Sequence, residues 1–137
     1  MIPPGVTAIE YYAFSCAKNL STVSIPDEVL IANYIDRQAG CNENGITQYI
    51  IGLGNPNYSS IDGVIFNKAG TAILTYPNNK PDANYVMPSS VTAIRNQAFE
   101  YSKNNQLQSI TLSPNLTSIG QYSFQALKLA TLNLPAS

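Results

Sequence analysis

The feature that most constrains this chain is a pattern that recurs at intervals of about 22 to 25 residues. It is clearest in residues 2–26, 87–113 and 112–135, where Val/Leu-Thr-x-Ile is followed by Ala/Ser-Phe and then by Leu-x-x-apolar-x-apolar. Such a period predicts that each repeat forms one coil and that stacked coils bury a shared core. The recurring apolar residues are Val6, Ile9, Phe14, Leu20, Val23 and Ile25 in the first copy, Val91, Ile94, Phe99, Leu107, Ile110 and Leu112 in the third, and Leu116, Ile119, Phe124, Leu129, Leu132 and Leu134 in the last.

A divergent copy and an insert lie between these repeats. In residues 25–51, Val29, Ile46, Tyr49 and Ile51 take apolar positions, but the Ala-Phe pair is missing. Further on, two β-rich runs flank Asn67-Lys68-Ala69-Gly70, which predicts a β-hairpin. We therefore expect one domain over residues 1–137, with repeats at about 2–25, 25–51, 87–112 and 112–135 and a hairpin insert at about 58–77.

The alternation inside a repeat predicts how each coil is built. In Thr22-Val23-Ser24-Ile25 the two apolar side chains share one face of a strand, and Thr22 and Ser24 share the other. Helix signals are weak, with short turns expected around residues 11–16, 97–102 and 122–127. The predicted fold is mainly β with short helical turns, as a right-handed solenoid of about four coils with an inserted β-hairpin.

Composition excludes several classes of function. The chain contains no His, which removes Ser-His-Asp triads and almost every zinc site. A net charge of -1 gives no basic excess for nucleic acid. No apolar run is long enough to insert into a membrane, and residues 1–10 do not resemble a signal peptide. We expect no enzyme activity, no catalytic residue, no cofactor and no metal.

Three local features of the sequence have a structural interpretation. Gly52-Leu53-Gly54-Asn55-Pro56 superficially resembles a motif of peptidyl-tRNA hydrolases, but those enzymes need a His, so it is interpreted as a loop. Asp62-Gly63 is interpreted as a turn, because no second acid lies close enough in sequence to help bind Ca²⁺. Cys16 and Cys41 either form a disulfide or are small buried side chains, and the position of Cys16 beside a core turn favours burial.

The repeats resemble the BspA-like leucine-rich repeat family, whose unit runs roughly L-x-x-I-x-I-P-x-S-V-T-x-I-G-x-x-A-F-x-x-C-x-x-L. The resemblance is close over residues 2–26 and 87–135, and residues 58–77 resemble a hairpin insert common in that family. The family's regular cysteine is replaced by Ala17, Ser102 and Leu127. The resemblance implies a leucine-rich-repeat solenoid, an extracellular or cell-surface location, and adhesion or protein binding rather than catalysis.

The candidate interaction surface combines exposed tyrosines with neutral strand residues. Tyrosine offers contact area and a hydroxyl group at low entropic cost. Two rival hypotheses are a carbohydrate-binding module that uses these tyrosines and a purely structural spacer. The expected partner is a protein, such as a host or matrix protein, or a glycan. The candidate residues are Tyr11, Tyr12, Tyr34, Tyr101, Tyr122, Thr22, Ser24, Ser109, Thr111, Thr131 and Asn133.

Both ends of the sequence lie within the repeat pattern and show no polar cap. Residues 2–3 already match the consensus, and Leu132 and Leu134 are as apolar as the internal copies. Exposed coil ends present strand edges that favour association. We expect either a fragment of a longer repeat array or self-association through the solenoid ends.

Overall fold

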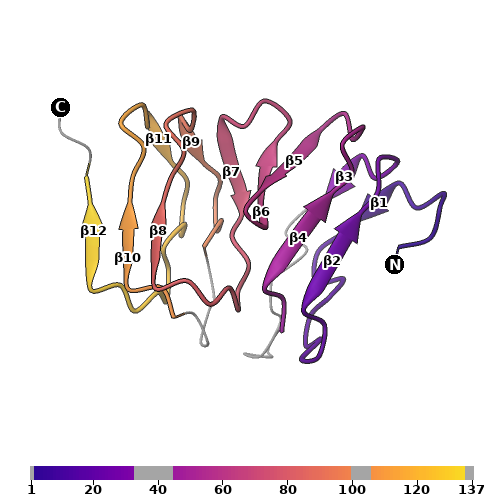
Figure 1. The fold of residues 1–137 in the computed structure, drawn as a ribbon, viewed down its shortest axis with the longest axis horizontal. Coiled ribbons are helices and arrows are strands. Elements are labelled where there is room, and N and C mark those ends of the chain that lie inside the picture. Colours follow the sequence, from indigo (N-terminus) through magenta and orange to yellow (C-terminus); the bar gives the residue numbers. More distant parts are fainter. Residues whose placement is uncertain (1, 33–44, 100–105, 135–137) are drawn as a thin grey trace.

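The computed structural model describes residues 2–32, 45–99 and 106–134, and these residues form short β-strands with no helix among them. The chain winds into a solenoid of about four coils, which confirms the predicted fold class (Figure 1). The strands are β1 (Ala8–Ile9), β2 (Thr22–Ile25), β3 (Ile31–Ala32), β4 (Gln48–Ile51), β5 (Tyr58–Ile61), β6 (Val64–Asn67), β7 (Ala72–Thr75), β8 (Asn84–Val86), β9 (Ala93–Ile94), β10 (Ser109–Thr111), β11 (Ser118–Ile119) and β12 (Thr131–Asn133).

The strands stack into two series on either side of the coils. One series contains the parallel pair β2-β4 and the parallel sheet β8-β10-β12. The other contains the parallel pair β1-β3 and a five-stranded sheet in the order β5-β6-β7-β9-β11. In Figure 1 the first series runs from β2 on the right to β12 on the left. Outside the insert, each coil thus contributes one strand to each side, as the repeat pattern requires.

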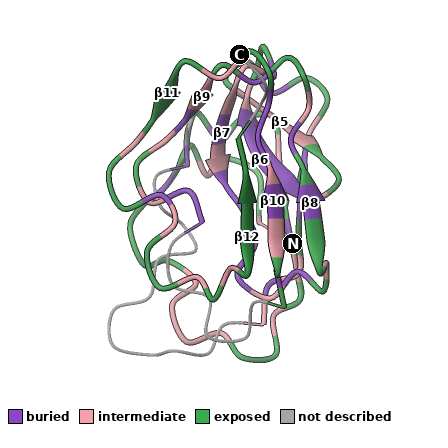
Figure 2. Cartoon of the chain, turned by 90° about the vertical axis from the view of Figure 1, so that its left-hand side faces the viewer, coloured by how far each residue is buried: buried purple, intermediate pink, exposed green. Residues whose placement is uncertain are grey.

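The predicted alternation of buried and exposed residues is present in the first series. Val23 and Ile25 are buried, and Ser24 between them is exposed. The same pattern places Ile110 in the core between two outward-facing residues. Strand β12 departs from it, since Leu132 is 40% exposed and the whole strand is coloured as exposed in Figure 2. The reason is that β12 pairs with β10 on one edge and no described strand covers its other edge.

The insert contains the predicted hairpin and one strand more. Strands β6 and β7 pair in antiparallel fashion around Asn67–Gly70, and Asn67 Oδ1 accepts hydrogen bonds from the backbone N–H groups of Thr71 (2.8 Å) and Ala72 (2.9 Å). Strand β5 pairs with β6 through a tight turn at Asp62-Gly63, where both residues have positive φ (50° and 77°). This confirms Asp62-Gly63 as a turn. The strand β5 was not predicted, because its polar residues lack an apolar alternation.

The insert interrupts the first series between β4 and β8. It covers the edge of β4, where the N–H of Tyr49 donates to the Gly63 carbonyl (2.9 Å) and the N–H of Ile51 donates to Ser60 Oγ (3.1 Å). Beyond it, Lys80 Nζ bridges Asp62 (3.1 Å) and Asp82 (2.8 Å), and the Lys80 side chain is nearly buried. An ion pair therefore fastens the turn of the insert to the segment that leads into β8.

The repeat pattern predicts one row of Phe14, Phe99 and Phe124, and the structure confirms it only for Phe99 and Phe124, with Tyr76 as the third ring. The rings of Phe99 and Phe124 lie 5.5 Å apart, and Tyr76 stacks on the other side of Phe99 at 4.9 Å. Phe14 packs in a separate core cluster formed by the N-terminal coils. Tyr76 thus takes a Phe position that the sequence pattern did not assign, because the insert disrupts the repeat just before it.

The short turns predicted around residues 11–16 and 122–127 are present, and left-handed residues keep them from being helical. Tyr12 and Tyr122 occupy equivalent positions two residues before Phe, with φ of 64° and 57°. Cys16 and Ala126 occupy equivalent positions two residues after Phe, each with φ of 63°. A right-handed helix cannot continue through such residues. The third predicted turn, at 97–102, is described only through Phe99.

Cys16 belongs to a disulfide in the structure, so its interpretation as a small buried hydrophobe is wrong. The residue is half-buried at its turn rather than enclosed in the core, and such a site leaves the sulfur accessible for bonding. Cys41, the other cysteine in the sequence, lies outside the described residues.

Alkaline pH is expected to destabilise the region around the Lys80 bridge. Burial raises the pKa of Tyr76 and of Tyr85 well above the usual value near 10, and the carboxylates of Asp82 and Asp62 raise both further. Burial lowers the pKa of Lys80, but its bonds to Asp82 and Asp62 outweigh burial, so that pKa is raised too.

The folded protein therefore keeps these protons at a pH where the unfolded chain loses them. The free energy of unfolding should be unaffected by these groups below about pH 9.5 and should fall above it, by up to about 1.4 kcal/mol per pH unit for each group. Urea denaturation between about pH 8 and pH 11 tests this, with Tyr85→Phe expected to show a shallower decline. An equal decline in the variant would contradict the role given to Tyr85.

Candidate functional site

The outward side chains of the first strand series form one surface, which we call the strand face. Residues two apart on each strand point the same way, and the registers of β2-β4 and of β8-β10-β12 align them in two rows, each interrupted by the insert between β4 and β8. The first row contains Thr22, Gln48, Asn84, Ser109 and Thr131. The second row contains Ser24, Ile50, Val86, Thr111 and Asn133.

Side chains of the first row bond to one another across neighbouring strands. Gln48 Nε2 donates to Thr22 Oγ1 at 3.1 Å, and the Ser109 hydroxyl donates to Asn84 Oδ1 at 2.6 Å. These bonds support the stacking of coils, as the predicted row of neutral polar side chains allows. They also use part of the hydrogen-bonding capacity that a partner would need.

The second row differs because it exposes two β-branched apolar side chains. Ile50 is 49% exposed and Val86 is 69% exposed, although each lies in a strand whose neighbouring residues are well packed. Both residues favour strand formation, so their presence in strands is not surprising in itself. Their exposure nevertheless leaves apolar surface on a face otherwise lined by Ser, Thr, Asn and Gln.

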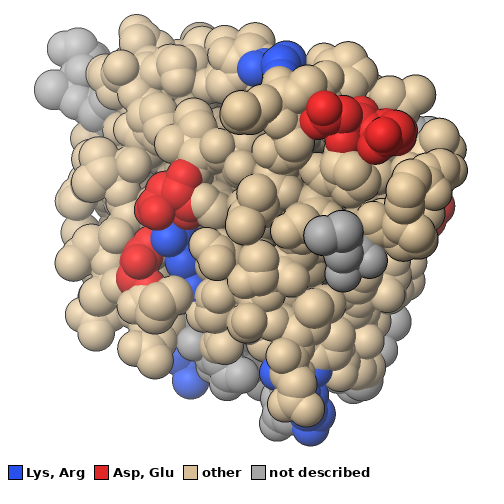
Figure 3. Space-filling view, turned by 45° about the vertical axis from the view of Figure 1, so that its right-hand side comes forward, with Lys and Arg blue, Asp and Glu red and all other residues tan. Residues whose placement is uncertain are grey.

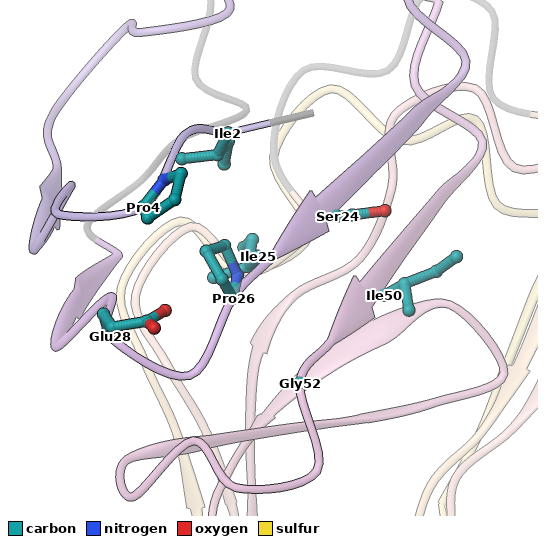
Figure 4. Close-up of a pocket in the computed structure, with 8 residues that line it drawn as sticks. All are labelled: Ile2, Pro4, Ser24, Ile25, Pro26, Glu28, Ile50 and Gly52. Carbon is teal, nitrogen blue, oxygen red and sulfur yellow. The ribbon is translucent and has the colours of Figure 1, made fainter.

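A hollow of about 360 Å³ lies at the end of the second row (Figure 4). Three segments that are distant in sequence form it: residues 2–4, residues 24–28 and residues 50–52. Figure 4 shows the Glu28 carboxylate turned toward Pro26 and Ile25. The lining residues are Ile2, Pro4, Ser24, Ile25, Pro26, Glu28, Ile50 and Gly52. The hollow is therefore mostly apolar, with one carboxylate and one hydroxyl in its lining.

The loop beside this hollow explains the Gly52-Leu53-Gly54 motif. The Asp27 carboxyl group lies against both glycines, so that a Cβ atom at either position would come within 3.0 Å of Asp27 Cγ. Any larger residue would displace Asp27. The interpretation of this motif as a loop is confirmed, since residues 52–57 contain no strand. Its glycine spacing serves the close approach of Asp27.

The two rows of the strand face contain no charged side chain. Most of the surface in Figure 3 is uncharged. Among the described residues, no cluster of His, Cys, Asp and Glu could hold a metal ion. The described part of the chain also contains no helix long and apolar enough to cross a membrane.

The predicted tyrosines that the structure describes do not belong to the strand face. Tyr11 and Tyr12 are exposed on the turn that links β1 to β2, with ring centroids 6.4 Å apart and planes tilted by 49°. Tyr122 is exposed on the equivalent turn of the last coil, while Gln97 takes that position in the coil before it. Tyr34 and Tyr101 lie outside the described residues. The structure therefore brings Tyr11 and Tyr12 together but shows no continuous row of tyrosines in the described coils.

Of the predicted strand residues, Thr22, Ser24, Ser109, Thr111, Thr131 and Asn133 all lie on the strand face. The prediction of candidate sites omitted Ile50, Val86 and Glu28. Val86 could have been found from the sequence, because it precedes Met87 as Ser24 precedes Ile25. Nothing in the sequence indicates that residues 2–4 lie beside Ile50.

Comparison with known proteins places the chain in a family. A family model described as the BspA type leucine-rich repeat region matches residues 1–82 and 75–137, in six copies. The chain belongs to the BspA-type leucine-rich repeat family. Members of this family are often surface proteins involved in binding, and their repeats are typically non-enzymatic binding modules. A search of the curated proteins found no match.

Solved structures of bacterial repeat proteins share the fold. A leucine-rich repeat protein from Eubacterium ventriosum is 27% identical with a TM-score of 0.77, over 93% of this chain and 32% of that one. The pneumococcal vaccine antigen PcpA is 28% identical with a TM-score of 0.78, over 93% and 31%. A leucine-rich cell surface protein from Faecalibacterium prausnitzii, 23% identical over 97% and 34% with a TM-score of 0.72, is alike in fold. The chain thus spans about a third of the length of these proteins.

Proposed function

We propose that this domain is a protein-binding module of a cell-surface or secreted protein, and that it binds its partner through the strand face without catalysis. The observation that carries the proposal is the exposure of Ile50 and Val86 on a face of neutral polar side chains, beside an apolar hollow. Exposed apolar side chains with a polar surround are typical of surfaces that bind other proteins.

Support also comes from the related proteins. One of the similar structures is a cell surface protein and another is a vaccine antigen. Both descriptions fit a module that meets other molecules outside the cell. The family is also known for binding rather than for chemistry.

Because the strand face carries little charge, we expect binding to depend only weakly on the salt concentration. The second row contains no charged side chain, so electrostatic steering contributes little to the rate of association. Affinity would then come from apolar burial at Ile50 and Val86, surrounded by water-mediated contacts of the Ser and Thr hydroxyls.

Binding to a panel of purified matrix and serum proteins tests the proposal. The double variant Ile50→Ser/Val86→Ser should weaken binding of any captured protein by about tenfold or more. Ile119→Ser is a matched control, because Ile119 is 48% exposed but lies in β11 of the other strand series. An equal loss in the control would contradict the strand face as the binding surface.

A glycan array distinguishes the rival hypotheses. Binding that depends on Tyr11 and Tyr12 but not on Ile50 and Val86 would favour the carbohydrate-binding module and contradict the proposal. An absence of any partner in both assays, together with a parent protein that is shortened when the domain is deleted, would favour a structural spacer and also contradict it.

A further inference from the structure

We propose that the hollow at the end of the second row is an anchor pocket for a lysine side chain of the bound protein. This inference rests on the proposed function and names the chemistry of the partner at one end of the strand face. Three features of the pocket favour a lysine side chain: its shape, its lining and its charge.

The shape suits a single long side chain. A volume of about 360 Å³ is near the lower end of the range for small-molecule sites. Ser24 and Ile50 belong both to the pocket and to the second row of the strand face. A partner lying along that row would therefore reach the pocket with one of its side chains.

The lining suits an aliphatic stem. Ile2, Pro4 and Pro26 contribute apolar surface from two segments, and Ile25 contributes a side chain that is itself almost fully buried. Contact with these residues would remove the methylene groups of a lysine from water. Lysine commonly buries its stem in this way while its ammonium group stays at a polar rim.

The negative charge at the pocket favours a cationic side chain. Glu28 lines the pocket, and Asp27 lies next to it, held against Gly52 and Gly54. Neither carboxylate takes part in an ion pair among the described residues. Lys68 reaches this loop, but its Nζ donates to the Leu53 carbonyl (2.9 Å) and forms no ion pair with Asp27 or Glu28.

Other occupants fit less well. A purely apolar side chain would cover Glu28 without giving it a partner, and an unpaired buried carboxylate is costly. An anionic group would be repelled by both carboxylates. A lysine meets both requirements, because its stem contacts the apolar walls and its ammonium group pairs with Glu28.

Small alkyl probes test this chemistry without an identified partner. Methyl-resolved NMR would follow the methyl groups of Ile2, Ile25 and Ile50 during titration with n-hexylammonium, 1-hexanol or hexanoate. The three probes share one alkyl chain and differ in charge. We expect shifts at these methyl groups, with n-hexylammonium binding about two- to fivefold more tightly than hexanol and hexanoate binding most weakly.

Two variants complete the experiment. Glu28→Gln should reduce the affinity for n-hexylammonium to that for hexanol. Glu10→Gln removes an exposed carboxylate outside the pocket and should leave the affinities for n-hexylammonium and for hexanol unchanged. Unperturbed methyl signals elsewhere would show that the variants are folded.

Equal affinity for hexanol and n-hexylammonium in the unmodified protein would overturn the inference, as would an absence of shifts at the three methyl groups. Such a failure would leave the proposed function intact, because that is tested independently by the Ile50 and Val86 variants with whole partner proteins.

Discussion

Replacing Phe99 by alanine is expected to lower the free energy of unfolding by about 3–5 kcal/mol. Phe99 is 1% exposed, and its ring lies between Tyr76 at 4.9 Å and Phe124 at 5.5 Å, with Tyr85 at 6.0 Å. Its removal would leave a cavity enclosed by rings on more than one side. Urea or thermal denaturation of the variant measures the loss.

Phe124→Ala provides the comparison. Phe124 occupies the equivalent position in the next coil but is only partly buried, so the cavity is smaller and more open to water. We expect a loss clearly below that of Phe99→Ala. Equal and small losses in the two variants would mean that the aromatic row is not the centre of the core.

Replacing Asn55 by alanine is expected to cost about 3 kcal/mol or more. Asn55 is fully buried and makes four hydrogen bonds to backbone groups. Its Nδ2 donates to the carbonyl groups of Pro26 (3.1 Å) and Val29 (2.8 Å), and its Oδ1 accepts from the N–H groups of Asn57 (3.0 Å) and Tyr58 (2.9 Å). The variant leaves several of these groups without partners, at about 1–3 kcal/mol each where they stay buried.

Asn57→Ala is the matched control for this prediction. Asn57 also bonds to the preceding coil, since its Nδ2 donates to the Leu30 carbonyl (2.8 Å), but the residue is exposed and water can replace it. We expect a loss of at most about 1 kcal/mol. If Asn55→Ala were no more destabilising than Asn57→Ala in chemical denaturation, the role of Asn55 in joining coils would be wrong.

The coil architecture could be predicted from the sequence because each repeat restates the same pattern of buried residues. Val23, Ile25 and Ile110 are buried where the pattern places them, and the hairpin around Asn67–Gly70 forms where its turn residues stand. Such features depend on local periodicity and turn chemistry. Because the pattern recurs in several repeats, the same feature can be recognised at more than one place in the sequence.

Other features of the fold depend on contacts between coils and could not be predicted. Asn55 lies in a Gly/Pro loop, and its burial follows from carbonyl groups that the preceding coil presents. Tyr76 joins the aromatic row through its contact with Phe99 of another coil. Tyr12 and Tyr122 adopt left-handed backbone angles that are more usual for Gly or Asn, so their residue types do not indicate this geometry.

The candidate site could be predicted only where it follows from a local pattern in the sequence. The alternation of buried and exposed side chains placed Thr22, Ser24 and Thr111 on the strand face, because this alternation follows from the two-residue period of a strand. The pocket depends on residues 2–4 lying beside Ile50, which no local pattern expresses. The high number of tyrosines led to the prediction of binding residues on turns. Tyr11, Tyr12 and Tyr122 are exposed there but do not belong to the strand face.

Cross-saturation NMR tests the central claim most directly, because it reports which methyl groups of this domain touch a bound protein. The domain would be deuterated except at its methyl groups, and a protonated partner from the binding panel would be irradiated. We predict loss of signal at the methyl groups of Ile50 and Val86 and none at Ile119, whose exposure is similar to that of Ile50. Signal loss at Ile119 or Leu53, with Ile50 and Val86 unaffected, would contradict binding through the strand face.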